Sequence, residues 1–410
     1  MSLQLILKKV KLSNPCIRKL FSIYQTFKTK MRNMIFNYLS HILSKRKTWT
    51  TVLKILIVLI YQSNATFAQS SGTVEWASFE LSQLVIEPGT KMSGNLFINA
   101  GIDNIETFIP VTVFHGSKPG PVLSLIAGIH GSEYAPILSM QRLPDLLDPV
   151  EMSGTLIIVH IANMPAFQAR TVYFGPNDLK NLNRTFPGNP NGTVTERIAN
   201  TITQEVMSQS DYLVDIHSGD ANESLRPSYT AYYKEAGSEE IISESERIAF
   251  AFGLETVVQF AGSYNSVEDA IYTSAQAVTR GIPAIDVESG ELGIVDNIFI
   301  DPITEGALNV LKELGMLAGQ YEPPHNPLIV TDRARIYSEH QGIWHADELV
   351  QTGDYVTEGT TLGVITDYFG NKLQAILAPA SGVLLILFGT PPVNEGDNIV
   401  VIGELPVTDG

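Results

Sequence analysis

A histidine and a carboxylate follow a short apolar segment in the first half of the chain. Residues 122–127 form an apolar run of the length expected for a strand that is buried on both faces. His130 comes next, between two glycines, and Glu133 follows three residues later. Neutral imidazole and carboxylate are both zinc ligands, and a catalytic zinc site needs three protein ligands and an open position. Two of the three ligands are therefore available here.

Two further apolar segments end in residues that could complete such a site. His217 closes one of them, and Glu288 stands before a glycine at the end of the other. Because the carboxyl ends of parallel strands lie along one edge of a sheet, these side chains should meet there. Each has a simpler explanation when taken alone: a single His-x-x-Glu is a weak signal, and His217 could be a hydrogen-bonded histidine at a strand end. Together they favour a metallohydrolase, whereas His160 lies inside an apolar run and is predicted to be a core residue.

Four motifs carry a resemblance to a known family. They are residues 128–133 (Gly-Ile-His-Gly-Ser-Glu), 181–188 (Asn-Leu-Asn-Arg-Thr-Phe-Pro-Gly), 215–219 (Asp-Ile-His-Ser-Gly) and 288–290 (Glu-Ser-Gly). Their order and spacing resemble those of the succinylglutamate desuccinylase/aspartoacylase family, whose members are relatives of the zinc carboxypeptidases. The resemblance covers roughly residues 75–320, and the tail resembles the C-terminal domain that is common in this group.

The resemblance assigns roles to residues of these motifs. It implies one zinc ion per chain, held by His130, Glu133 and His217, and a catalytic Glu288 that takes a proton from water and delivers it to the departing amine. It also implies that Asn183 and Arg184 hold the carboxylate of the substrate. The planar donor fork of an arginine suits that task. Pairing of this arginine with a surface acid is the alternative in so acidic a chain.

Two further residues keep open assignments. Relatives often have another arginine close to Arg170, where this chain has Val172. Arg170 is therefore the candidate substrate-binding partner of the oxyanion that develops during hydrolysis. Asp215 stands two residues before His217 and is predicted either to orient that imidazole or to serve as a cap or turn residue.

Charge is distributed unevenly along the chain. The 410 residues have a net charge of -16, yet residues 1–70 carry 12 Lys and Arg and no Asp or Glu. The remaining residues therefore carry 15 basic and 43 acidic side chains, a net charge of -28. A surface this acidic would repel nucleic acid and anionic lipid. The expected partner is a small molecule that carries a carboxylate, with a homo-oligomer left open.

Residues 1–68 are predicted to be an N-terminal extension with a signal peptide. A basic stretch at residues 45–47 precedes a short apolar core at residues 52–61, and small residues favour cleavage after Ala68. We therefore expect a periplasmic or secreted protein. An uncleaved leader would instead tether it to the membrane, although the apolar core is short for a bilayer span. The single cysteine, Cys16, lies in this extension, so the mature chain would have neither disulfides nor thiolate metal ligands.

The remaining pattern predicts two domains. Residues 69–322 alternate strands with helices, which predicts an α/β catalytic domain with a mostly parallel mixed sheet and flanking helices; the resemblance makes this fold zinc carboxypeptidase-like. Residues 323–410 carry short strands and a weak internal repeat, which predicts a small all-β barrel-sandwich domain. This domain lacks the lysine context of a biotinyl or lipoyl carrier, so a lid or an oligomerisation module is favoured. Helices of the catalytic domain are predicted at residues 135–147, 195–208, 239–252, 267–280 and 303–317.

The sequence as a whole predicts an exported zinc-dependent hydrolase. Its target would be an amide C–N bond, not a peptide bond, in an N-acyl amino acid or a similar small carboxylate. A metallocarboxypeptidase or amidase that acts on peptides or cell-wall fragments is the first alternative. A non-catalytic binding protein is the second, and Glu288 argues against it because a binding module needs no general base.

Overall fold

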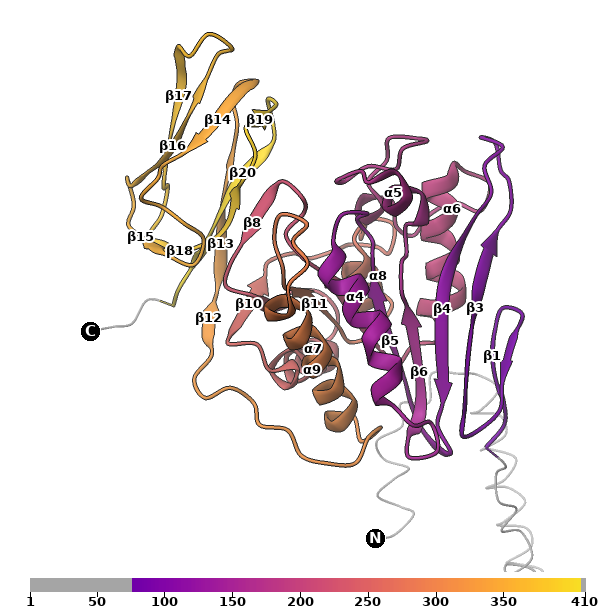
Figure 1. The fold of residues 1–410 in the computed structure, drawn as a ribbon. Coiled ribbons are helices and arrows are strands. Elements are labelled where there is room, and N and C mark those ends of the chain that lie inside the picture. Colours follow the sequence, from indigo (N-terminus) through magenta and orange to yellow (C-terminus); the bar gives the residue numbers. More distant parts are fainter. Residues whose placement is uncertain (1–75, 407–410) are drawn as a thin grey trace, which may run out of the picture. The chain divides into compact units, whose positions relative to one another are not determined.

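The structure is a computed structural model that describes residues 76–406 (Figure 1). The predicted leader and its cleavage after Ala68 lie outside the described residues. Within residues 76–406, no helix combines the length and the apolar content that are needed to cross a membrane.

A nine-stranded mixed sheet forms the centre of the catalytic domain (Figure 1). The four central strands, β11, β7, β5 and β6, run parallel to one another. On either side of these four the direction changes, because β9 is antiparallel to β11, and β4 is antiparallel to β6 and to β3. The mixed α/β fold predicted from the alternation of strands and helices is therefore confirmed. In spatial order the strands are β12 (Leu328–Val330), β10 (Thr256–Phe260), β9 (Tyr229–Tyr233), β11 (Ala284–Glu288), β7 (Tyr212–His217), β5 (Lys118–Ala127), β6 (Ser153–Val159), β4 (Thr107–His115) and β3 (Thr90–Ile98).

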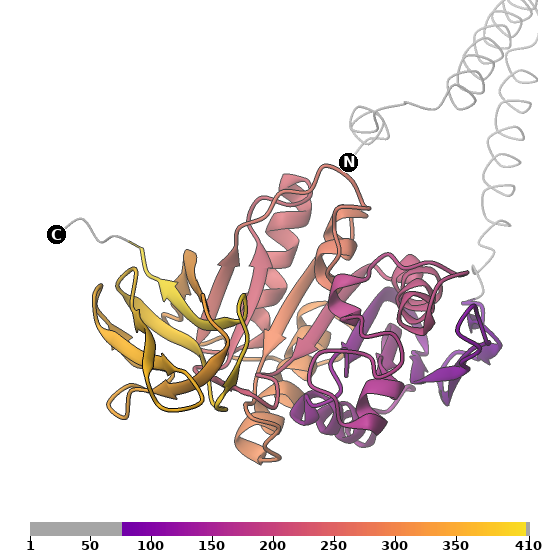
Figure 2. The same ribbon diagram turned by 90° about the horizontal axis from the view of Figure 1, so that it is seen from above.

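Helices cover both faces of this sheet (Figure 2). On one face, α4 (Tyr134–Arg142), α7 (Glu239–Phe252) and α9 (Asn297–Glu313) bury apolar side chains against the strands. On the other face, α6 (Val194–Thr201) and α8 (Thr273–Thr279) do the same. Because the central strands are buried on both sides, their apolar runs show little alternation, as in residues 123–127 of β5, all of which are buried.

Several helices differ from their predicted bounds. The prediction for α7 is confirmed, because Ser238 caps its first turn and Gly253 ends it in the left-handed conformation. The helix predicted at residues 267–280 begins only at Thr273, and the one predicted at 303–317 already begins at Asn297, where Asp296 caps the first turn. The helix predicted at 195–208 is divided into α6, a π turn (Ile202–Val206) and a 3-10 turn (Met207–Gln209). The helix predicted at 135–147 is α4 followed by a 3-10 turn (Leu143–Leu146).

Shorter elements complete the catalytic domain. Strands β1 (Phe79–Leu81) and β2 (Leu84–Ile86) form an antiparallel hairpin. Between β6 and α6 the chain contains α5 (Met164–Ala169) and a 3-10 turn, η2 (Leu182–Arg184). This turn matters for the site, because it carries the predicted substrate-binding residues.

The C-terminal part is all-β and is connected to the catalytic domain by exchanged strands. It has one sheet in the order β13-β20-β18-β15 and a second in the order β17-β16-β14-β19. Strand β8 (Glu223–Leu225), from the catalytic domain, pairs with β18, whereas β12, beyond the predicted boundary at residue 322, pairs with β10 of the large sheet. The C-terminal strands are β13 (Asp332–Tyr337), β14 (Gly342–Ala346), β15 (Tyr355–Val356), β16 (Thr361–Thr366), β17 (Lys372–Leu377), β18 (Gly382–Phe388), β19 (Pro392–Val393) and β20 (Asn398–Glu404).

Candidate active site

The turn after β5 places His130 and Glu133 at the carboxyl edge of the sheet. Gly128 has φ = +71°, and a Cβ atom there would lie 2.9 Å from the Cα atom of Ile161. At Gly131 a Cβ atom would lie 2.3 Å from a backbone carbon of Ala166, which leaves no room for any other residue. The two glycines that bracket His130 therefore allow a tight turn, and Glu133 follows as the residue that precedes α4.

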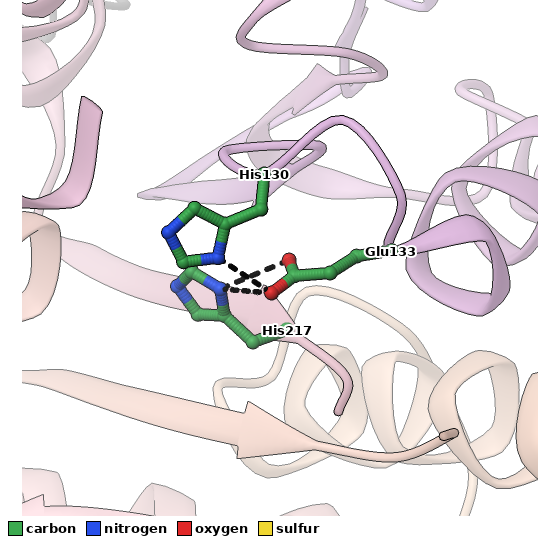
Figure 3. Close-up of side chains that lie close together, drawn as sticks. All are labelled: His130, Glu133 and His217. Atoms are coloured by element: carbon green, nitrogen blue, oxygen red, sulfur yellow. Dashed lines mark hydrogen bonds and ion pairs between the residues drawn. The ribbon is translucent and has the colours of Figure 1, made fainter. Parts of the chain in front are cut away.

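The structure brings His130, Glu133 and His217 together (Figure 3). Nδ1 of His130 is 2.8 Å from Oε1 of Glu133, and Nδ1 of His217 is 3.0 Å from Oε2 of the same carboxylate. All three side chains are buried, and their potential ligand atoms lie within 4.8 Å of one another. Both imidazoles thus present the same ring nitrogen to a shared centre.

The opposite nitrogen of each imidazole faces an oxygen atom of the protein. Nε2 of His130 is 3.1 Å from Oδ1 of Asn181, and Nε2 of His217 is 3.0 Å from Oδ2 of Asp215. An acceptor at Nε2 keeps the proton there and leaves the lone pair of Nδ1 free for a metal. Of the two roles predicted for Asp215, its position beside Nε2 of His217 favours the one that orients an imidazole. Two imidazoles with free Nδ1 atoms and one carboxylate form a donor set that fits zinc.

The electrostatics of these residues favour a bound cation. Burial alone would raise the pKa of Glu133, but the two adjacent imidazoles outweigh it and lower the pKa to about 2. Burial would lower the pKa of His130, but Asp220 and Glu133 hold it well above its ordinary value. The same balance, with Asp215 and Glu133 as the neighbours, raises the pKa of His217. The pocket therefore keeps its carboxylate ionised and stabilises positive charge at the position where a metal would bind.

Glu288 lies beside this centre at the end of β11. It pairs in register with His217 on the parallel strand β7, so both side chains leave the sheet at the same edge. Its Oε2 atom is buried and has no hydrogen-bond partner among the described residues. Burial raises the pKa of Glu288 well above its ordinary range, and the charge of Glu133 raises it further. A carboxyl group with a raised pKa, close to a metal centre but outside its ligand set, can accept and return a proton.

The predicted substrate-binding pair lies on the other side of the imidazoles. Asn183 is buried, its Oδ1 accepts from the backbone N–H of Thr273 at 3.0 Å, and its amide nitrogen is 3.4 Å from Nε2 of His217. Arg184 is exposed, stacks on the ring of Tyr272 at 4.3 Å and donates from Nη1 to the carbonyl oxygen of Asn183. Within residues 76–406 it forms no ion pair with a carboxylate. Most of its donors therefore remain free for a ligand.

Arg170 and His160 are not brought into this cluster. Arg170 is exposed at the end of α5 and lines a surface pocket of about 580 Å³ with Tyr134 and Phe167. Its contribution to oxyanion binding stays a prediction. His160 is half-buried, and its Nε2 atom lies 2.8 Å from Oγ1 of Thr112, away from the ligand atoms.

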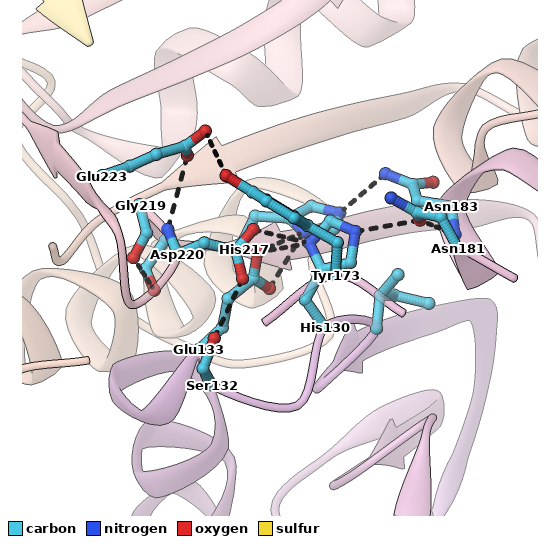
Figure 4. Close-up of polar contacts among 12 residues, drawn as sticks. His130, Ser132, Glu133, Tyr173, Asn181, Asn183, His217, Gly219, Asp220 and Glu223 are labelled. Carbon is cyan, nitrogen blue, oxygen red and sulfur yellow. Dashed lines mark hydrogen bonds and ion pairs between the residues drawn. The ribbon is translucent and has the colours of Figure 1, made fainter. Parts of the chain in front are cut away.

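Three residues without a predicted role also border the centre (Figure 4). Oδ2 of Asp220 is 3.3 Å from Nδ1 of His130. The ring of Tyr173 meets that imidazole edge-on, with 6.0 Å between centroids, and its hydroxyl group lies 2.8 Å from Oδ1 of Asn222 and 3.0 Å from Oε1 of Glu223. Asp220 could have been suspected because it follows His217 by three residues. The other two could not, because their positions depend on loop conformations and on the pairing of β8.

Comparisons with known proteins show which proteins this chain is similar to. A family model described as the succinylglutamate desuccinylase/aspartoacylase catalytic domain matches residues 119–314. An N-alpha-acetyl-L-2,4-diaminobutyric acid deacetylase from Halomonas elongata is 30% identical over 324 residues, which cover 75% of this chain and 91% of that protein.

Solved structures of similar proteins share the fold of this chain. A succinylglutamate desuccinylase from a Silicibacter species superposes with a TM-score of 0.68 at 26% identity, over 80% of this chain and 97% of that one. A succinylglutamate desuccinylase/aspartoacylase from Rhodobacter sphaeroides gives a TM-score of 0.68 at 25% identity, over 78% and 96% of the two chains.

Proposed function

The chain belongs to the succinylglutamate desuccinylase/aspartoacylase family, and from that premise we propose that it is a zinc-dependent deacylase of N-acyl amino acids. Family members hydrolyse amide bonds, and the relative from Halomonas elongata is named for the removal of an acetyl group from an amino acid. The observation that carries the proposal is the convergence of His130, Glu133 and His217 beside Glu288.

The catalytic roles follow from the chemistry of the side chains. Zinc held by His130, Glu133 and His217 would supply Lewis acidity, which activates water and polarises the amide carbonyl group. Glu288 accepts the proton that water loses when it attacks the carbonyl carbon. The same residue then donates this proton to the nitrogen as the C–N bond breaks, so that the products are a carboxylate and an amine. Asp215 and Asn181 hold the two imidazoles in the required orientation.

Substrate recognition would use the donors of the η2 turn. The guanidinium group of Arg184 is fixed by its stacking on Tyr272, and its free donors can bind a carboxylate in two parallel hydrogen bonds. The amide nitrogen of Asn183 lies within reach of the same ligand and of the imidazole of His217. The relative from Halomonas elongata acts on an amino acid with a second amino group, and we include N-acetylated diamino acids among the substrates proposed for this chain.

Two further proposals concern location and the C-terminal domain. We propose export to the periplasm or beyond, on the strength of the basic and apolar pattern in residues 1–68. We also propose that the two small sheets after residue 331 form a barrel-sandwich domain without a carrier function, because no lysine stands in a suitable hairpin context.

Metal analysis of protein purified without chelators tests the proposed function. We expect about one zinc per chain, together with hydrolysis of N-acyl amino acids. His217→Ala should lose both the metal and the activity. The matched control is His345→Ala, which removes an exposed histidine of the C-terminal domain and should retain both. Wild-type protein that neither contains zinc nor regains it on reconstitution would contradict the proposal.

A further inference from the structure

We propose that Asp215, Asp286 and Ser274 form a second cation site, in which oxygen atoms bind a hard cation behind the imidazole of His217. The site faces Nε2 of this imidazole, whereas zinc would bind at Nδ1 of the same ring. A cation at this position would hold Asp215 in place beside the imidazole, whichever substrate the enzyme hydrolyses.

Strand pairing brings the two carboxylates together. Asp286 on β11 pairs in register with Asp215 on the parallel strand β7. Residues paired in this way project from the same face of the sheet, and adjacent strands are about 4.8 Å apart. Potential ligand atoms of Asp215, Asp286 and His217 lie within 4.8 Å of one another. A cation with oxygen ligands at about 2.3–2.6 Å can contact both carboxylates at this spacing.

Three oxygen atoms in this cluster lack partners. Oδ1 of Asp215, Oδ2 of Asp286 and Oγ of Ser274 are buried and have no hydrogen-bond partner among the described residues. The relative exposures of the three residues are 0%, 7% and 0%. The remaining oxygen atom of Asp215, Oδ2, faces Nε2 of His217 at 3.0 Å. Buried polar atoms are nearly always paired, so three orphaned atoms in one place indicate a bound species.

Ser274 reaches the carboxylates from the helix that covers them. It lies in the first turn of α8, which packs on β11 and β7. Burial and the charge of Asp215 raise the pKa of Asp286 to about 7, whereas the charge of His217 and the adjacent hydroxyl group of Ser274 lower it. The hydroxyl oxygen is therefore beside the Asp286 carboxylate and available as a neutral ligand.

Uncompensated charge favours a cation over a water molecule. Within residues 76–406, no Lys or Arg nitrogen lies within 4.0 Å of Asp215 or Asp286. Zinc would lie on the far side of the imidazole, where Glu133 offsets part of its charge. A water molecule could donate to both carboxylates, but it would leave their mutual repulsion in place. A cation satisfies the oxygen atoms and also offsets the buried charge.

The donor set indicates the class of cation. Nε2 of His217 keeps its proton towards Asp215, so this nitrogen is not a ligand. The donors that remain are two carboxylates and one hydroxyl group, all of them oxygen. Such a set suits hard cations such as Na⁺, K⁺, Mg²⁺ or Ca²⁺, whereas zinc prefers sites with nitrogen or sulfur ligands.

Anomalous diffraction from crystals of the zinc-loaded protein tests the site directly. Rubidium chloride and strontium chloride supply stand-ins for monovalent and divalent hard cations. We expect an anomalous peak between Asp215, Asp286 and Ser274 in one of the two soaks, which identifies the charge of the natural cation. Ordinary water density without an anomalous signal in either soak would overturn the proposal, and a zinc signal at this position would contradict the oxygen-only assignment. A missing zinc peak beside Glu133 would count against the proposed function alone.

Thermal unfolding measures the energetic effect of the cation. The zinc-loaded protein is unfolded in chloride salts of Na⁺, K⁺, Mg²⁺ or Ca²⁺ and, at equal ionic strength, in tetramethylammonium chloride, whose cation is too bulky for a buried site. The cation that binds, at about 100 times its Kd, should raise the Tm by about 4 °C. Asp286→Asn should reduce this rise to less than about 1 °C, and Ser274→Ala should reduce it while both charges remain.

Two comparisons separate cation binding from a structural role of Asp286. In tetramethylammonium chloride, Asp286→Asn should be at least as stable as wild type, because the repulsion between the carboxylates is removed. A merely structural role would make the variant less stable in every salt by the same amount, and that result would overturn the proposal. The control is Glu246→Gln, since Glu246 is held by Tyr232 at 2.7 Å away from the cluster, and this variant should keep the full rise in Tm.

Discussion

Replacement of Glu288 by glutamine tests the division of labour between metal ligands and proton carrier. Glutamine has the same shape as glutamate, but its amide group cannot accept a proton from water. Oε2 of Glu288 has no hydrogen-bond partner among the described residues, so a terminal NH2 group at that position would break no bond of the folded chain. We therefore expect the variant to fold, to bind about one zinc and to bind substrate as wild type does.

The expected loss is confined to turnover. Proton transfer by a positioned side chain is worth about 10²- to 10⁴-fold, which corresponds to about 2.7–5.5 kcal/mol of activation free energy. kcat should fall by that factor, with little change in KM. A base must be deprotonated to act, so the rate of wild type should fall as the pH drops through the pKa of Glu288, which burial raises. The residual rate of the glutamine variant should lack this acid limb.

Steady-state kinetics between pH 5 and 9, together with metal analysis of the same samples, provide the measurement. Loss of zinc would make Glu288 a ligand and refute the assignment of His130, Glu133 and His217 as the complete set. A kcat within about threefold of wild type would remove Glu288 from proton transfer altogether.

Three further changes test other parts of the structure. Arg184→Ala should raise KM for an N-acyl amino acid more than it lowers kcat, because the carboxylate contact is present in both ground and transition states; equal KM values in the two proteins would exclude the contact. Asp215→Asn should weaken zinc binding about 10- to 100-fold by loosening the imidazole of His217, measured by competition with a chromophoric chelator; unchanged affinity would contradict the orienting role. Asp103→Ala should destabilise the fold by about 3 kcal/mol in urea unfolding at pH 7, because it leaves the buried Arg197 without its carboxylate partner, which lies 3.0 Å away. Burial would raise the pKa of Asp103, but its hydrogen bonds, chiefly the one to Arg197, lower it. The greater stability of wild type over the variant should therefore be full at neutral pH and be lost as the pH falls below the usual carboxyl range. A variant as stable as wild type at pH 7 would contradict this.

The sequence predicts best where local and global signals coincide. His217 and Glu288 stand at the ends of apolar segments, and parallel pairing with register places them side by side. The helix α7 is predicted with its observed bounds because its capping serine and terminal glycine adjoin the apolar stripe. In such places a short window of sequence contains the physical cause of the structure.

The remaining features depend on contacts between distant segments. The helix α8 begins at Thr273, whose backbone N–H is held by Asn183 from a turn ninety residues earlier in the chain. Glu223 reaches the site because β8 pairs with a strand of the C-terminal domain. Tyr173, which contacts Glu223 in space, lies in an irregular loop whose sequence shows no hydrophobic periodicity. No local pattern could place these side chains.

The exchange of β8 and β12 between the sheets has a consequence for the biogenesis of the protein. The chain is made from its N-terminus, so the strands that carry His130, His217 and Glu288 are complete before β18 has been synthesised. The partner of β8 therefore appears late, and Glu223 is fixed last. During translation the metal ligands can therefore assemble before this side of the site is complete. A shortened product that lacks β18 would retain every proposed ligand of the metal yet lack the strand pairing that fixes Glu223.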